Sequence, residues 1–292
     1  MIVDFHTHIF PDRIAERAVA SLKKNSHTAA FSDGTSEGLI ERDRAAGIDL
    51  AVVLPVATAP DQVTHINDRA AETNRRYPGL LSFASIHPDL TDAADELKRV
   101  KEIGLKGVKL HPVYQGKDID DPAFLRILDV CAGLGLIVIT HGGWDIGFPG
   151  VGHCQPDQIR RAVRTVDPEG KTLKFVAAHM GGWRIWEQVP EMLCDTAVYL
   201  DTSFSTGHFY PLGGNEYDGY YEGKDTDMLD TEGFMELYRV FGSERILFGT
   251  DSPWSDAGES LAFIRALPVS EEEKAQVLGK TAMKLLGLTE TE

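Results

Sequence analysis

Histidines recur in this chain at positions where several of them could share one metal ion. His6 and His8 are separated by a single residue, and side chains two positions apart on an extended strand point to the same side. Two imidazoles placed in this way can bind one divalent cation, since imidazole is a common metal ligand. A lone His-X-His pair also arises by chance, but here other apolar runs end in residues of the same kind. These residues are His87, His111, His141, His179 and Asp251.

The apolar runs that precede these residues are short, and each is followed by helical sequence. Uninterrupted runs of Val, Ile, Leu and Phe are typical of parallel strands covered on both faces. Eight strands are predicted, at Ile2–His6, Leu50–Pro55, Leu80–Ile86, Gly107–Leu110, Leu136–Thr140, Leu173–Ala178, Ala197–Asp201 and Ile246–Gly249. Eight alternating units predict an α/β fold whose strands close into a (β/α)8 barrel, the TIM-barrel fold. The carboxyl ends of barrel strands meet on one face, so the histidines and Asp251 would meet there.

Local signals at segment ends support helices between these strands. Asp121 precedes Pro122, the order of an N-cap followed by a proline at the first helical position. Further along, Ser270 and Glu273 form a capping box, and the helix that they begin would end at Gly287. This extra C-terminal helix follows the eighth unit, and we expect it to pack across the outside of the barrel.

Two stretches interrupt the regular spacing of strands and helices. Asn25–Ser36 is a polar insertion after the first predicted helix, and Phe204–Asp230 is a long segment rich in Gly, Tyr and Asp. A loop of that length inside a compact domain is usually functional or disordered. Its glycines and aromatic residues predict a lid over the barrel mouth or a contact with a second subunit. Because no repeat or linker-like sequence is found, one domain spanning residues 1–292 is predicted.

The overall composition indicates a globular protein with an acidic surface. The 292 residues are 42% hydrophobic and 25% charged, and the formal net charge is −16. An acidic surface repels nucleic acid and anionic membranes, so neither is expected as a partner. No secretory signal is recognised, and no apolar run approaches the roughly 18 residues of a membrane span. The three cysteines form no CxxC pair, so a reducing, cytoplasmic location is expected.

Six sequence segments carry a resemblance to a known family. They are DFHTHIFP (4–11), GVKLHP (107–112), VITHGG (138–143), AAHMGGW (177–183), LFGTDSPW (247–254) and LGKTAMKLLGL (278–288). With them the chain resembles the amidohydrolase superfamily, and specifically its amidohydrolase-related branch of hydrolases and non-oxidative decarboxylases. That family usually has Asn where this chain has Thr281, at a position that we interpret as structural.

The resemblance implies a fold of the metallo-dependent hydrolase type with one divalent ion. The ligands of that ion would be His6, His8, His141 and Asp251. His179 would stand beside the ion as an acid or electrophile, and Asp251 would also handle protons, so these two are the predicted catalytic residues. Three imidazoles with one carboxylate suit zinc, while manganese, iron or cobalt could use the same ligands. An open coordination position would hold a water molecule with a pKa of about 7.

Other side chains at the same face of the predicted barrel are candidates for lining a substrate pocket. They are Lys109, His111, Trp144, His153, Trp183, Arg184, His208 and Trp254. The tryptophans suggest an aromatic or otherwise planar substrate, and Arg184 could bind a substrate carboxylate. In two-metal relatives the lysine at the position of Lys109 is carboxylated. An ordinary lysine is favoured here, because the branch that the chain resembles mostly binds one metal.

The predicted function is hydrolysis of a small, aromatic or carboxylate-bearing substrate by a metal-activated water. Non-oxidative decarboxylation in the same site is the alternative, because the same ligands serve both reactions. A phosphoesterase of the histidinol-phosphatase type is disfavoured because it needs further ligands. A non-catalytic barrel is disfavoured because the chain keeps both His179 and Asp251. The expected partner is a small-molecule substrate, whose identity the fold does not specify. A homodimer or a higher homo-oligomer is left open.

Overall fold

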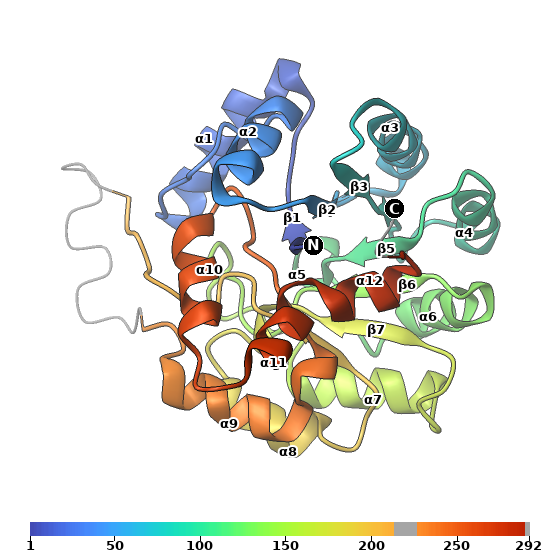
Figure 1. The fold of residues 1–292 in the computed structure, drawn as a ribbon. Helices are drawn as coiled ribbons and strands as arrows, with labels where there is room; N and C mark the ends of the chain where they lie inside the picture. Colours follow the sequence, from blue (N-terminus) through green and yellow to red (C-terminus); the bar gives the residue numbers. More distant parts are fainter. Residues whose placement is uncertain (213–226, 290–292) are drawn as a thin grey trace.

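The parallel strands form a ring that is surrounded by helices (Figure 1). The computed structural model describes residues 1–212 and 227–289. The strands follow one another in chain order: β1 (Val3–Thr7), β2 (Leu50–Val53), β3 (Leu80–Ser82), β4 (Ala84–Ser85), β5 (Gly107–Leu110), β6 (Ile137–Thr140), β7 (Lys174–Ala177), β8 (Tyr199–Asp201) and β9 (Ile246–Leu247). The amide of Phe5 donates to the carbonyl of Phe248 at 2.8 Å, and Thr7 bridges Ser252. These contacts join β1 to the end of β9, so the ring closes as expected for a (β/α)8 barrel.

The third strand of the barrel is broken into two short pieces, β3 and β4. β3 pairs with β2 and β4 pairs with β5, so the two pieces share the neighbours of one strand between them. The side chain of Asn74 takes the place of a ladder partner, because it accepts from the amide of Ser82 at 2.5 Å and donates to its carbonyl at 3.0 Å. The prediction of eight strand positions is confirmed, with the third made in two steps.

Helices surround the ring, and several begin at the signals recognised in the sequence (Figure 1). They are α1 (Asp12–Ser26), α2 (Ser36–Ala46), α3 (Val63–Arg76), α4 (Ala93–Glu102), α5 (Pro112–Gln115), α6 (Pro122–Leu134), α7 (Pro156–Val166), α8 (Val189–Leu193), α9 (Thr231–Phe241), α10 (Ala257–Ala266), α11 (Glu271–Ala275) and α12 (Thr281–Leu286). Asp121 caps α6 by accepting from the amide of Ala123 at 2.7 Å. The capping box of Ser270 and Glu273 is confirmed, and Gly287 ends α12 with a left-handed backbone. Within the described parts of the chain, no helix is long and apolar enough to cross a membrane.

The strands separate an inner layer of the hydrophobic core from an outer one. Inner residues such as Val3 and Ile139 pack together with the apolar face of α12, including Ala282 and Leu285. Lys106, directly before β5, donates to the carbonyl of Leu286 at 2.9 Å, which places α12 at the amino-terminal end of the strands. The expectation that this helix lies across the outside of the barrel was therefore wrong. Its apolar face covers the inner layer at the bottom, because those side chains would otherwise be open to water.

The two segments that interrupt the sequence pattern lie against each other. α1 extends to Ser26, and the residues after it form a short antiparallel contact with the segment that follows β8. The amide of Ala29 donates to the carbonyl of Tyr210 at 2.9 Å, and the amide of Leu212 donates to the carbonyl of His27 at 2.7 Å. Residues 213–226 of the predicted lid lie outside the described residues, so the lid stays a prediction.

Candidate active site

Side chains from the carboxyl ends of six strands meet at one end of the barrel. Four imidazoles form a continuous arc there, and neighbouring ring centroids are 4.7 to 5.1 Å apart. In order along the arc they are His8, His6, His179 and His141. A fifth ring, that of His111, stacks on His141 at 4.6 Å. Five of the histidines expected at the strand ends are therefore neighbours in space, while His87 is not part of the arc and contacts the amide of Asp89.

His6 reaches this site because β1 departs from regular alternation. Phe5 belongs to the inner layer of the core, so its neighbour His6 would point outward from a regular strand. The pairing of β1 with β2 shifts register between Asp4 and Thr7. An irregularity of this kind re-aims a side chain, and here both Phe5 and His6 face the interior. His6 and His8 do face the same centre, although the strand between them is not the regular one assumed from their spacing.

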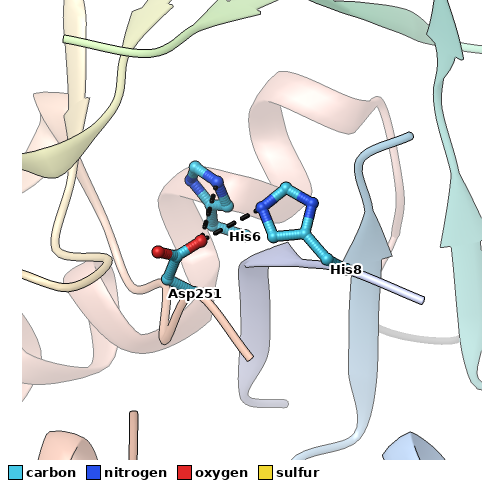
Figure 2. Close-up of side chains that lie close together, drawn as sticks. All are labelled: His6, His8 and Asp251. Atoms are coloured by element: carbon cyan, nitrogen blue, oxygen red, sulfur yellow. Dashed lines mark hydrogen bonds and ion pairs between the residues drawn. The ribbon is translucent and has the colours of Figure 1, made fainter. Parts of the chain in front are cut away.

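His6, His8 and Asp251 form a compact group of possible metal ligands, here called the β1–β9 group (Figure 2). Asp251 Oδ1 lies 3.3 Å from His6 Nε2 and 3.1 Å from His8 Nε2. Nδ1 of each ring faces an acceptor oxygen: Asp201 Oδ2 at 2.9 Å for His6, and the carbonyl of Leu54 at 2.8 Å for His8. Each Nδ1 therefore carries the hydrogen of the neutral ring, and each Nε2 presents a lone pair to Asp251.

This arrangement fits a bound cation. Lone pairs and a carboxylate that converge on one point repel each other unless a positive charge lies between them. In a tetrahedral zinc site with ligands 2.0–2.2 Å from the metal, neighbouring ligand atoms are about 3.3 to 3.6 Å apart. The separations of 3.1 and 3.3 Å in the β1–β9 group are close to that value. Two imidazoles and a carboxylate are a donor set for a divalent transition-metal ion.

His141 lies in a second group of possible ligands. Its ligand atom lies within 4.8 Å of those of His111 and Asp145, and we call these three residues the β5–β6 group. His141 Nε2 donates to the carbonyl of Trp144 at 3.0 Å, so Nδ1 carries the lone pair of the neutral ring. The structure thus gathers three of the four predicted ligands into one group, and His141 stands beyond His179 in the arc of rings.

Asp201 and Ser203, which the sequence analysis did not single out, hold two of the imidazoles in place. Ser203 Oγ lies 2.9 Å from His6 Nδ1 and 3.0 Å from His179 Nδ1, and it donates to Asp201 Oδ1. The carbonyl of Ser203 accepts from His179 Nδ1 at 2.9 Å, which leaves the lone pair of that ring on Nε2. The place of Asp201 at the carboxyl end of a predicted strand was the signal that could have revealed it.

Lys109 places a buried amine beside the β1–β9 group. Lys109 is 1% exposed, and its Nζ lies 3.2 Å from His6 Nε2. Burial lowers the pKa of Lys109 to about 8, against the attraction of Asp201 and Asp251. A cation at this point offsets part of the negative charge of the two buried carboxylates.

Burial also changes the protonation of the site. Desolvation, and then the charge of Lys109, lowers the pKa of His6 well below its ordinary value and that of His141 to about 3. Desolvation, followed by repulsion from His141, lowers the pKa of His179. These imidazoles are therefore neutral near pH 7, as metal ligands must be. Desolvation raises the pKa of Asp251, so this carboxyl group holds a proton more readily than an exposed one.

Asp251 and His179 share an uncommon backbone conformation. Their φ angles are 63° and 58°, in the left-handed region that non-glycine residues rarely adopt. The amide of Asp251 donates to the carbonyl of His6 at 2.8 Å, and the amide of His179 donates to Asp201 Oδ1 at 3.0 Å. Backbone strain of this kind is concentrated at functional sites, where the surrounding structure enforces it.

A buried set of charges, here called the Arg42 network, braces β1 against the segment after β9. Asp4 Oδ1 accepts from the amides of His6 and Thr250 at 3.2 and 2.9 Å. Arg42 on α2 donates to Asp4 Oδ2 at 2.7 Å and to the hydroxyl of Thr250 at 2.9 Å. Arg42 also pairs with Asp43 at 2.5 Å, so two buried carboxylates share one guanidinium. The network fixes the backbone on both sides of the candidate metal ligands.

The chain matches the sequence profile of the family described as Amidohydrolase over residues 3–288. It belongs to the amidohydrolase family. It is similar to a 2-amino-3-carboxymuconate-6-semialdehyde decarboxylase from Dictyostelium discoideum, with 26% identity over 252 residues, which cover 79% of this chain and 67% of that protein. The resemblance found in the sequence is confirmed, and the protein is a metal-dependent enzyme of this family.

Two solved structures are similar over nearly the whole chain. A 5-carboxyvanillate decarboxylase from Sphingomonas paucimobilis has a TM-score of 0.68 and 18% identity, covering 99% of each chain. A dihydroxybenzoic acid decarboxylase from Polaromonas, with bound manganese and the inhibitor 2-nitroresorcinol, has a TM-score of 0.66 and 15% identity, covering 98% of this chain and 96% of the other. At these identities the likeness shows the fold, and it confirms the barrel.

Two candidate pocket residues of this amidohydrolase, Trp144 and Trp254, are linked to the site through their backbone, and the carbonyl of Trp183 accepts from the amide of Trp144 at 3.1 Å. The carbonyl of Trp144 holds His141, and the amide of Trp254 donates to the carbonyl of Asp251 at 2.9 Å. The ring of Trp183 is buried, and its Nε1 has no hydrogen-bond partner within residues 1–212 and 227–289. The predicted role of these residues in substrate binding stays a prediction.

The other candidates lie farther from the two donor groups or at their edge. The guanidinium of Arg184 lies 4.9 Å above the ring of Trp183. His153 pairs with Asp118 at 2.6 Å, and the exposed ring of His208 pairs with Glu259 on α10 at 3.3 Å. Both histidines thus have carboxylate partners outside the β1–β9 and β5–β6 groups, and neither belongs to them. His111, by contrast, is part of the β5–β6 group.

Proposed function

We propose that this amidohydrolase is a non-oxidative decarboxylase of a small carboxylic acid with an aromatic or otherwise planar body. The observation that carries the proposal is the 26% identity, over 252 residues, with a decarboxylase. The two solved structures compared above are also decarboxylases by their descriptions. These comparisons favour the alternative of the sequence analysis over its leading expectation, hydrolysis.

The proposed metal centre consists of the β1–β9 group together with His141. One divalent ion is expected in the protein as purified, and zinc suits three imidazoles with one carboxylate. When bound, such an ion would act as a Lewis acid toward a substrate oxygen and stabilise the negative charge left by the departing CO2. His141 would contribute Nδ1, since Nε2 donates to the carbonyl of Trp144. Elemental analysis that finds manganese instead would overturn the choice of zinc and leave the reaction in place.

The surroundings of the centre support an anionic, planar substrate. The buried amine of Lys109 attracts a substrate carboxylate, and the buried carboxylates Asp201 and Asp251 alone would repel it. Aromatic rings continue the arc of imidazoles, because Tyr114 stacks on His111 with ring centroids 3.8 Å apart. Phe148 lies 5.1 Å from Tyr114. Flat aromatic walls with a few polar groups are typical of pockets for planar ligands.

A proton donor is the second requirement of decarboxylation. Loss of CO2 breaks a carbon–carbon bond and leaves its electron pair on the substrate carbon, which then takes up one proton. Asp251 would supply this proton from the oxygen turned away from His6 and His8 (Figure 2). His179 Nε2 would then pass a solvent proton to the carboxylate that is left.

Release of CO2 from a panel of hydroxybenzoates and related planar carboxylic acids tests the proposal. Reaction in D2O should place one deuterium on the carbon that lost the carboxylate, because the proton comes from an exchangeable group. Substrate analogues without the carboxylate should give no product. Hydrolysis of ester or amide analogues by the metal-loaded protein, with no CO2 from any acid of the panel, would reject decarboxylation in favour of hydrolysis.

A further inference from the structure

His111 is an unsatisfied buried histidine at the edge of the candidate active site. It is 8% exposed, and its Nδ1 has no hydrogen-bond partner in the part of the chain that the structure describes. Its Nε2 faces Asp145 Oδ2 at 3.5 Å, which is longer than a hydrogen bond between these atoms. The long contact with Asp145 leaves Nε2 able to take a closer ligand, and such a ligand would stabilise the buried ring.

The other two members of the β5–β6 group place possible ligand atoms close to His111. Asp145 Oδ1 accepts from the amide of Gly147 at 2.7 Å, which leaves Oδ2 for His111. His141 has its lone pair on Nδ1, because Nε2 donates to the carbonyl of Trp144. The ligand atoms of all three residues lie within 4.8 Å of one another, and all three residues are buried. With the hydrogen of the neutral His111 ring on Nδ1, its Nε2 would be a third acceptor beside Asp145 Oδ2.

We propose that His111, His141 and Asp145 form a second site for a divalent cation of the zinc class, filled when that ion is in excess. Two imidazoles and one carboxylate are sufficient ligands for such an ion, with water completing the shell. The separation of 3.5 Å between His111 Nε2 and Asp145 Oδ2 matches the edge of a tetrahedral zinc site, about 3.3 to 3.6 Å. The site goes beyond the proposed function, which needs one ion.

The two sites compete for one residue. His141 has a single lone pair on Nδ1, so it binds one ion at a time. The proposed function assigns His141 to the first ion, and an ion in the second site would withdraw it. Excess zinc should therefore inhibit the loaded enzyme. This consequence, unlike the second site itself, rests on the proposed function.

Zinc binding to the metal-free protein tests the second site without any substrate. Equilibrium dialysis followed by elemental analysis should find two equivalents in the wild type. Asp145→Asn and His111→Gln should each bind one equivalent with the affinity of the first site unchanged. Asp118→Asn is the matched control, because Asp118 also pairs with a histidine, His153, but outside both groups. It should keep two equivalents.

The outcomes separate this proposal from the proposed function. One equivalent in the wild type at saturating zinc, or two in both Asp145→Asn and His111→Gln, would reject the second site. Zinc-edge anomalous diffraction from wild-type crystals should show density between His111 and Asp145, and density at the β1–β9 group alone would also reject it. Two equivalents without inhibition by excess zinc would keep the second site and contradict the assignment of His141 to the first ion.

Discussion

The β1–β9 and β5–β6 groups contain the same kinds of ligand, but the protein holds them differently. In the first group, His6 Nδ1 and His8 Nδ1 each have an oxygen partner, and the Arg42 network fixes the backbone nearby. In the second group, His111 Nδ1 has no partner among the described residues, and the carboxylate accepts from the amide of Gly147 in its own loop. Ligands that are already oriented lose less freedom when the ion binds. Support from surrounding residues, more than ligand type, should make the first site the tighter one.

Asp251→Asn should have the largest effect on the supported group. The amide keeps an oxygen for the ion but loses the carboxyl proton, so kcat should fall by about 10²- to 10⁴-fold while bound metal is retained. Steady-state kinetics and elemental analysis on the same preparation measure both quantities. Asp118→Asn provides the control for an aspartate that faces a histidine elsewhere. A near-native rate in Asp251→Asn would remove Asp251 from proton transfer.

Arg42→Met tests whether the Arg42 network stabilises the fold and supports the first metal site. The substitution leaves Asp4 and Asp43 buried without their cation, which costs about 3 to 5 kcal/mol of unfolding free energy. It should also weaken the first zinc equivalent and leave the second unchanged, because the network contacts only the β1–β9 side. Urea unfolding and zinc titration measure the two effects.

Arg245→Met is the matched control for Arg42→Met. Arg245 is also partly buried, but its guanidinium donates to backbone carbonyls, including those of Thr196 and Val240. No carboxylate is left unpaired when it is replaced, so a smaller loss of stability and unchanged zinc affinity are expected. Equal weakening of zinc binding in both variants would show that the Arg42 network is not specific to the site.

Asp43→Asn should change how stability depends on pH. Desolvation raises the pKa of Asp43 from the ordinary 3.8 to about 6, because it outweighs the attraction of Arg42 while Asp4 adds repulsion. Because the pKa of Asp43 is higher in the folded state, the contribution of its carboxyl group to the unfolding free energy is fully present below pH 3.8. This contribution is lost as the pH rises through 6. The loss amounts to about 3 kcal/mol over that window, and Asp43→Asn should lack it.

Unfolding free energies of metal-free wild type and Asp43→Asn at pH 4 and pH 6.5 provide the measurement. The wild type should lose stability relative to the variant as the pH rises between these two values. Parallel profiles of the two proteins would show that Asp43 is ionised throughout, and that Arg42 neutralises Asp4 and Asp43 together.

The architecture could be predicted from the sequence because it rests on local patterns. Apolar runs gave the strand positions, and the caps at Asp121 and Ser270 gave helix starts that the structure confirms. Residues at strand ends, such as His6 and His179, could be placed at one face because a barrel brings all strand ends together. The break in the third strand escaped prediction, because it depends on Asn74 reaching from α3 into the ladder.

The details of the site depend on contacts that spacing does not reveal. Asp145 follows His141 in an irregular segment, so its approach to His111 appears only in three dimensions. Ser203 lies two residues beyond β8 and could not be distinguished from other loop serines. The position of α12 could not be predicted either, since an apolar face fits the side or the end of a barrel equally well.

The closure of the ring between β1 and the end of β9 determines when the site can form as the chain is made. His8 and Asp251 are 243 residues apart, and they meet only when the last strand docks beside the first. A nascent chain therefore carries both imidazoles of β1 long before it carries the carboxylate that faces them. Non-local contacts of this kind form late in folding. An ion at the proposed metal centre would therefore be bound stably only by a finished barrel and would not nucleate its folding.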